Sequence, residues 1–216
     1  MTIDLLITAL SPFGLIIRGG FHPSNDQSPL DVQTIIMIGN AGPAMWRTFS
    51  SKIPKTPNPL DAWTRQNLSP IADSFGAKAI YPFDGPPYYP FQKWAMQAEN
   101  VFPSPIGPLI HPVFGLWHAY RAAFLFSEHL DMPVKASTAS PCDTCADQPC
   151  LNTCPINAFT PGNYDVSGCR TFIATPEGHD CLHSGCLARR ACPVGQDYIY
   201  QAEQAEFHMQ SFLKAK

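Results

Sequence analysis

The sequence predicts an α+β fold in two parts, a sheet domain with packed helices followed by a smaller module with few regular elements. Strand-like and helix-like stretches alternate over residues 1–135, which is typical of a sheet covered by helices. All eight cysteines of the 216-residue chain lie between Cys142 and Cys192. We therefore expect residues 136–216 to form a separate module, in which bonds to metal replace part of a hydrophobic core. The periodicity of residues 196–214 predicts a final helix.

Apolar patterning and turn residues predict the elements of the first domain. Residues 34–39 are apolar and mostly β-branched, which is typical of a strand buried on both faces. Pro70 lies inside a stretch with helical spacing, where we expect it to kink or split the helix. A short helix is expected before the first strand. The other expected strands are 13–21, 77–83 and 117–126, and the expected helices are 42–49, 61–75 and 91–100.

The charge balance limits the class of partner. Only 14% of the residues are charged and the net charge is −3. No basic run is long enough to neutralise a phosphate backbone, so we expect no nucleic-acid partner. The apolar residues 5–17 are too few to span a bilayer, and no positive charge precedes them as in a signal peptide. We therefore expect a soluble, cytoplasmic protein with no membrane partner.

The cysteine spacing indicates iron–sulfur ligation. The first group reads C-x2-C-x4-C-x3-C-P from Cys142 to Pro155, and the second reads C-x4-C-x5-C-P from Cys181 to Pro193, with Cys169 alone between them. Bacterial two-cluster ferredoxins carry C-x2-C-x2-C-x3-C-P, and the fourth cysteine of that run ligates the other cluster. Closely spaced thiolates allow one loop to bind three corners of a cubane. The cysteine before proline then reaches the neighbouring cubane.

This pattern predicts two 4Fe–4S clusters that exchange one ligand each. The intervals are longer than in the ferredoxin run. Two zinc sites with four thiolates each are the alternative, although zinc sites usually pair two C-x2-C knuckles and only one is present here. Disulfides are disfavoured because the cytosol is reducing. The expected ligands are Cys142, Cys145, Cys150 and Cys192 for cluster one, and Cys154, Cys169, Cys181 and Cys186 for cluster two.

A second informative segment is HPVFGLWHAYR, residues 111–121. It combines aromatic faces, hydrogen-bonding groups and a cation, and its glycine would permit close approach of the backbone to a flat cofactor. We interpret it as one wall of a cofactor or substrate pocket. The alternative is that the aromatics belong to the core and the arginine is paired with a loop. The candidate pocket residues are His111, Phe114, Gly115, Trp117, Tyr120 and Arg121.

Both segments resemble parts of known families. The cysteine pattern resembles ferredoxin-type 4Fe–4S modules, and among them the C-terminal module of epoxyqueuosine reductases and reductive dehalogenases. Residues 111–121, together with 20–23 and 38–46, resemble the vertebrate cobalamin-processing protein, whose nitroreductase-like fold the cobalamin domains of those reductases share. The resemblance implies a nitroreductase-like domain over 1–135 that binds a corrinoid (cobalamin), and a ferredoxin-like module over 136–216.

The resemblance also implies an oxidoreductase activity. Two clusters would receive electrons from a donor protein and pass them singly to a site in the N-terminal domain, where a bound corrinoid or a small-molecule substrate is reduced. No motif identifies a catalytic residue, and the helical-repeat extension of epoxyqueuosine reductases is missing, so we expect a substrate other than epoxyqueuosine. Two alternatives stay open: a non-enzymatic electron carrier that docks on a partner, and a structural zinc protein that binds another protein.

Overall fold

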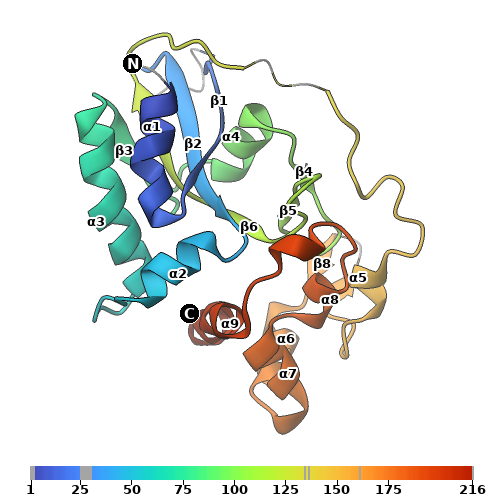
Figure 1. Ribbon diagram of the computed structural model, residues 1–216. Helices are drawn as coiled ribbons and strands as arrows, with labels where there is room; N and C mark the ends of the chain where they lie inside the picture. Colours follow the sequence, from blue (N-terminus) through green and yellow to red (C-terminus); the bar gives the residue numbers. More distant parts are fainter. Residues whose placement is uncertain (1–2, 25–30, 134, 136, 161, 216) are drawn as a thin grey trace. The chain divides into compact units, whose positions relative to one another are not determined.

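The computed structural model shows a chain that folds into two compact units (Figure 1). Unit 1 comprises Met1–Asn100 and His118–Thr138, and unit 2 comprises Val101–Trp117 and Ala139–Lys216. The division differs from the expected boundary near residue 135, because residues 101–117 belong with the cysteine-rich segment. The structure describes residues 3–24, 31–133, 135, 137–160 and 162–215.

Unit 1 is built on a four-stranded antiparallel sheet in the order β1-β2-β6-β3. The first strand begins at Ile16, because Ser11–Phe13 form a 3-10 turn closed by Gly14 with a φ of 64°. The third strand is shorter than expected, because the chain turns after it and the Tyr81 N–H donates to the Asp84 carboxylate. The strands are β1 (Ile16–Phe21), β2 (Thr34–Ala41), β3 (Lys78–Ile80) and β6 (His118–Phe126).

Both faces of this sheet are covered by helices. The prediction that the second strand is buried on both faces is confirmed, since β2 is buried from Thr34 to Asn40. Ile35 and Met37 pack with residues of the fourth helix, whereas Figure 1 shows the other three helices on the opposite side. The third helix continues through Pro70 instead of splitting there. The helices are α1 (Ile3–Leu10), α2 (Ala44–Ser50), α3 (Pro59–Ser74) and α4 (Phe91–Ala98).

Unit 2 consists of short elements around a small core. Ile110 and Leu116 pack with Phe159 and Ala188, which explains why residues 101–117 belong to this unit. The predicted C-terminal helix is present but starts later than expected, after a 3-10 turn. The hairpins are β4 (Phe102–Pro103) with β5 (Leu109–Ile110), and β7 (Phe159–Thr160) with β8 (Asn163–Tyr164). The helices are α5 (Pro149–Asn152), α6 (Val166–Ile173), α7 (His179–Ser184), α8 (Leu187–Arg190) and α9 (Ala202–Lys214), with 3-10 turns η2 (Pro176–Gly178) and η3 (Gln196–Tyr198).

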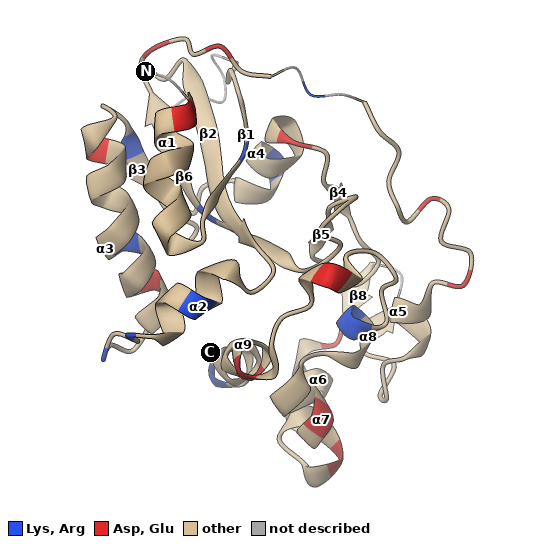
Figure 2. Ribbon diagram, in the orientation of Figure 1, with Lys and Arg blue, Asp and Glu red and all other residues tan. Residues whose placement is uncertain are grey.

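Charged side chains are sparse on both units. Figure 2 shows lysine and arginine at scattered positions along the ribbon. Among the described residues, no helix is both long and apolar enough to cross a bilayer.

Candidate functional site

The eight cysteines of unit 2 are free thiols that line two small cavities. The structure brings together the same two sets of four that the spacing predicts. Within the described part of the chain, no three His, Cys, Asp or Glu side chains converge as ligands of a single metal ion. Cavity one is lined by Cys142, Cys145, Cys150 and Cys192, and cavity two by Cys154, Cys169, Cys181 and Cys186.

Electrostatic interactions among the thiols follow the same division. Burial raises the pKa of the Cys150 thiol, and the proximity of Cys192 and Cys142 raises that pKa further. Burial also raises the pKa of Cys169, with a further contribution from Cys154 in the same direction. Four thiolates in one cavity therefore destabilise each other unless a cation lies between them. The donor set fits an iron–sulfur cluster, which binds four thiolates.

Local turns position the thiols of cavity one. The Cys145 N–H donates to the Cys142 carbonyl at 3.3 Å, so these two side chains belong to one tight turn. Gln148 adopts a left-handed conformation with a φ of 38° and directs the chain into α5, which carries Cys150. Cys192 lies beyond α8, and the backbone N–H of Val194 donates to its sulfur. Turn geometry thus gathers thiols from two distant stretches of chain.

Helix ends and backbone amides position the thiols of cavity two. The Ala158 N–H donates to the Cys154 sulfur at 3.3 Å. Cys169 lies on α6, which begins where the Asp165 carboxylate accepts a hydrogen bond from the Gly168 N–H at 2.8 Å. A backbone N–H that donates to sulfur, as that of Ala158 does to Cys154, stabilises negative charge on the sulfur. In iron–sulfur proteins such donors help to set the reduction potential.

Tyr164 is a residue of this site that the sequence did not single out. Its hydroxyl donates a hydrogen bond to the Cys169 sulfur. Burial raises the pKa of Tyr164 far above its usual range, so the hydroxyl keeps its proton and remains a donor. The ring stacks on Phe159 with a centroid distance of 4.6 Å, which fixes its orientation. No pattern in the sequence pairs this tyrosine with a cysteine, because the contact depends on the β7–β8 hairpin.

The six residues predicted to line a cofactor pocket do not belong to one unit. Tyr120 and Arg121 lie on β6 of unit 1, whereas the other four lie in unit 2. Trp117 is only 1% exposed, and the Arg189 guanidinium lies 4.5 Å from its ring centroid. The His111 ring stacks on Phe114 at 4.3 Å.

Gly115 does permit a close approach, but the group that approaches it is the backbone at Val194 and not a cofactor. Its φ is 57°, and a Cβ placed there would lie 1.9 Å from the Val194 carbonyl oxygen. His111 Nδ1 accepts hydrogen bonds from the backbone N–H groups of Val113 and Phe114 at 3.0 and 3.1 Å. This loop is therefore held by contacts within unit 2, which differs from the expected wall against a flat cofactor.

Tyr120 and Arg121 belong to a buried polar network of unit 1. The Tyr120 hydroxyl donates to the Glu99 carboxylate, and Arg18, 1% exposed, pairs with the same carboxylate at 2.7 Å. Arg121 Nε donates to Asn40 Oδ1 at 2.9 Å. Burial raises the pKa of Glu99, although Arg18 opposes this shift. These contacts favour the alternative reading, core aromatics and a paired arginine. No contact among the described residues supports a corrinoid site.

The fold is similar to that of solved epoxyqueuosine reductases. A crystal structure of this enzyme with an epoxyqueuosine-modified tRNA-Tyr stem loop has a TM-score of 0.53 at 15% identity, covering 99% of this chain and 68% of that chain. The enzyme from Streptococcus thermophilus has a TM-score of 0.52 at 15% identity, covering 91% and 67%. The Bacillus subtilis enzyme has 0.53 at 14% identity, covering 92% and 66%. No protein-family model matches the chain, and no curated protein matches it either.

These similarities define the class of fold, a mixed α/β protein of the epoxyqueuosine reductase type with a cysteine-rich second unit. They also correct one expectation. One similar structure is a complex with a tRNA stem loop, so few basic residues are not a reason to exclude nucleic acid for this fold. Proteins bind single-stranded loops largely by stacking and hydrogen bonding to splayed bases, which needs no long basic run.

Proposed function

We propose that the chain is an iron–sulfur oxidoreductase whose two 4Fe–4S clusters carry single electrons. The proposal rests on one observation, the division of eight free thiols into two cavities of four. The cavity-one cysteines would hold cluster one and the cavity-two cysteines would hold cluster two. The fold adds support, because the similar structures are reductases. When bound, such clusters supply reversible one-electron transfer.

The residues of this chain have three roles in the proposal. Thiolates anchor the clusters, amides such as that of Val194 donate hydrogen bonds to the anchoring sulfurs, and the apolar side chains of Ile110 and Leu116 exclude water. Exclusion of water strengthens each of these electrostatic contacts. A corrinoid has no role in the proposal, because nothing in the described residues supports one.

Anaerobic purification with metal and sulfide analysis tests the proposal. We expect roughly eight iron and eight sulfide per chain, and a broad visible absorption that dithionite bleaches. A colourless protein with about two zinc ions per chain would instead establish the zinc alternative. Reduced protein should then be offered a tRNA stem loop that carries epoxyqueuosine. Turnover of the modified base would identify a tRNA reductase, whereas reduction of partner proteins alone would identify an electron carrier.

Removal of one hydroxyl should change the potential of one cluster. We expect Tyr164→Phe to lower the reduction potential of cluster two by roughly 40 mV, which corresponds to a hydrogen bond of about 1 kcal/mol in a one-electron couple. The physical reason is that the hydroxyl stabilises the negative charge added to the cluster on reduction. A redox titration followed by electron paramagnetic resonance measures the shift.

Tyr198→Phe is the matched control, since Tyr198 packs against Phe114 at 4.8 Å and is not among the residues that line either cavity. Iron content should be equal in both variants. Unchanged potentials in Tyr164→Phe at full iron content would show that the hydroxyl has no influence on the cluster.

A further inference from the structure

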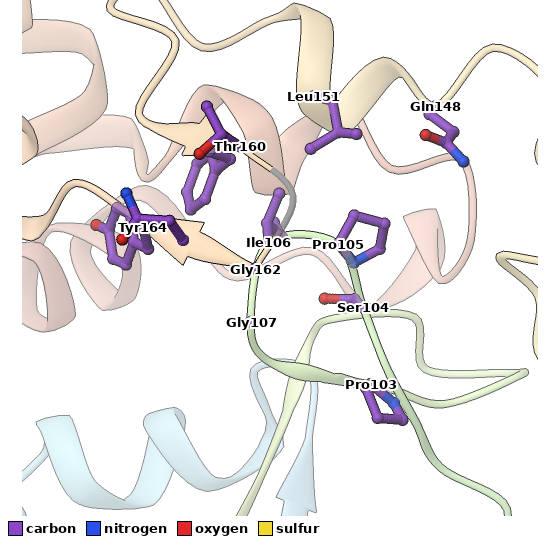
Figure 3. A pocket seen from close by; sticks show the side chains of 12 residues that line it. Pro103, Ser104, Pro105, Ile106, Gly107, Gln148, Leu151, Thr160, Gly162 and Tyr164 are labelled. Atoms are coloured by element: carbon purple, nitrogen blue, oxygen red, sulfur yellow. The ribbon is translucent and has the colours of Figure 1, made fainter.

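Unit 2 contains a third, larger cavity of about 550 Å³ (Figure 3). Its volume lies within the range of small-molecule sites. Three stretches line it: the turn after β4, the start of α5, and the β7–β8 hairpin. Figure 3 shows the turn residues Pro105 and Ile106 facing the hairpin across the opening. None of the cysteines lines it, so it is distinct from cavities one and two.

The lining of this third cavity is uncharged. Its apolar walls include Ile106, Leu151 and Phe159, and its polar groups are amides and hydroxyls only. Its amide groups belong to Gln148 and Asn163, and its hydroxyls include those of Thr160 and Tyr164. Side-chain amides and hydroxyls donate hydrogen bonds, so a ligand with acceptor oxygens can pair with them. The lining suits an uncharged molecule with apolar faces and acceptor oxygens.

The third cavity is adjacent to both groups of thiols. Gln148 and Pro105 line this cavity and cavity one. Phe159 lines this cavity and cavity two. Tyr164 lines it as well and donates a hydrogen bond to Cys169. An occupant would therefore be separated from each group of thiols by about one side chain. A position beside both proposed clusters suits an occupant that exchanges electrons with them.

We propose that this cavity binds an uncharged, planar, quinone-type ring that exchanges two electrons with the two clusters. The inference rests on the proposed function. Written as reduction of the ring, each reduced cluster loses one electron, the quinone gains two electrons and two protons from water, and a hydroquinone forms. In the reverse reaction, the hydroquinone gives one electron to each oxidised cluster and releases two protons. Redox carriers with phosphate groups fit less well, because no lysine or arginine lines the cavity to pair with them.

The test uses the cluster-loaded protein and duroquinone, a quinone whose ring carbons are fully substituted and so cannot add to thiols. Calorimetric titration of the oxidised protein measures binding, and stopped-flow absorbance measures reoxidation of dithionite-reduced clusters. We expect saturable reoxidation in the wild type. Thr160→Trp, which fills the cavity at an exposed position of its lining, should slow reoxidation at least tenfold and abolish binding.

Thr171→Trp is the matched control, because Thr171 is exposed on α6 and does not line the cavity. It should behave like the wild type. Equal binding and equal rates in Thr160→Trp and Thr171→Trp would overturn the inference, as would reoxidation that rises linearly with quinone and never saturates. Failure of the proposed function would give a distinct result, because the wild-type protein itself would then lack iron or would not be bleached by dithionite.

Discussion

The double variant Cys150→Ser/Cys192→Ser is expected to keep about half of the iron, whereas Cys150→Ser/Cys154→Ser is expected to lose almost all of it. The first pair lines cavity one only, so cluster two keeps its four thiolates. The second pair takes one ligand from each cavity. Iron and sulfide analysis, with electron paramagnetic resonance of the reduced protein, distinguishes these results.

The two double variants distinguish between two assignments of the cysteines to the clusters. If the four cysteines from Cys142 to Cys154 held one cluster and the four from Cys169 to Cys192 held the other, the outcomes would be reversed. The expected difference therefore separates a scheme with exchanged ligands from one that follows chain order. Loss of iron is coupled to loss of structure in small metal-bound modules, so circular dichroism should show a larger change for the second variant.

Replacement of one glycine should destabilise unit 2 severely. We expect Gly115→Ala to lower the free energy of unfolding by about 4 kcal/mol, from the strain of a left-handed alanine and from overpacking. The added Cβ would lie 1.9 Å from the Val194 carbonyl oxygen, so the backbone must move. Val194 follows Cys192 closely in the chain, and its displacement should also release cluster one. Denaturant titration monitored by circular dichroism and visible absorption measures both effects.

Gly162→Ala is the control that separates the cost of backbone strain from the cost of a steric clash. Gly162 has a φ of 75°, similar to the 57° of Gly115, but nothing lies within 4 Å of the Cβ position. We expect this control to cost only about 1 to 2 kcal/mol and to retain its iron. Equal losses of unfolding free energy in the two variants would mean that the contact between the Gly115 loop and Val194 does not stabilise unit 2.

Much of unit 1 follows from local patterns. The apolar run of β2 and the aromatic run of β6 predict central strands, since both are long enough for periodicity to be clear. The turn at Tyr81 shortens β3, and the hydrogen bond from Arg121 to Asn40 joins residues from different strands. The second of these contacts depends on strand pairing, which a single sequence does not encode locally.

The grouping of the cysteines was predictable for a different reason. Thiols close in sequence are close in space, and in the ferredoxin run the cysteine before proline ligates the other cluster, so spacing together with that pattern predicts which thiols line which cavity. The ligand role of these thiols is still a proposal. The position of residues 101–117 was not predictable, because Ile110 and Leu116 pack against residues far along the chain.

The sequence by itself determined that eight thiols gather in one part of the chain, because all eight cysteines lie within residues 142–192. Their division into two sets of four was predicted from the similarity to the ferredoxin run. Only the tertiary structure decided what surrounds them. It placed the Tyr164 hydroxyl at Cys169, packed Gly115 against Val194 and formed an open, uncharged cavity beside both sets. These features depend on contacts between segments distant in sequence, and such contacts form only when the hydrophobic core of unit 2 brings those segments together.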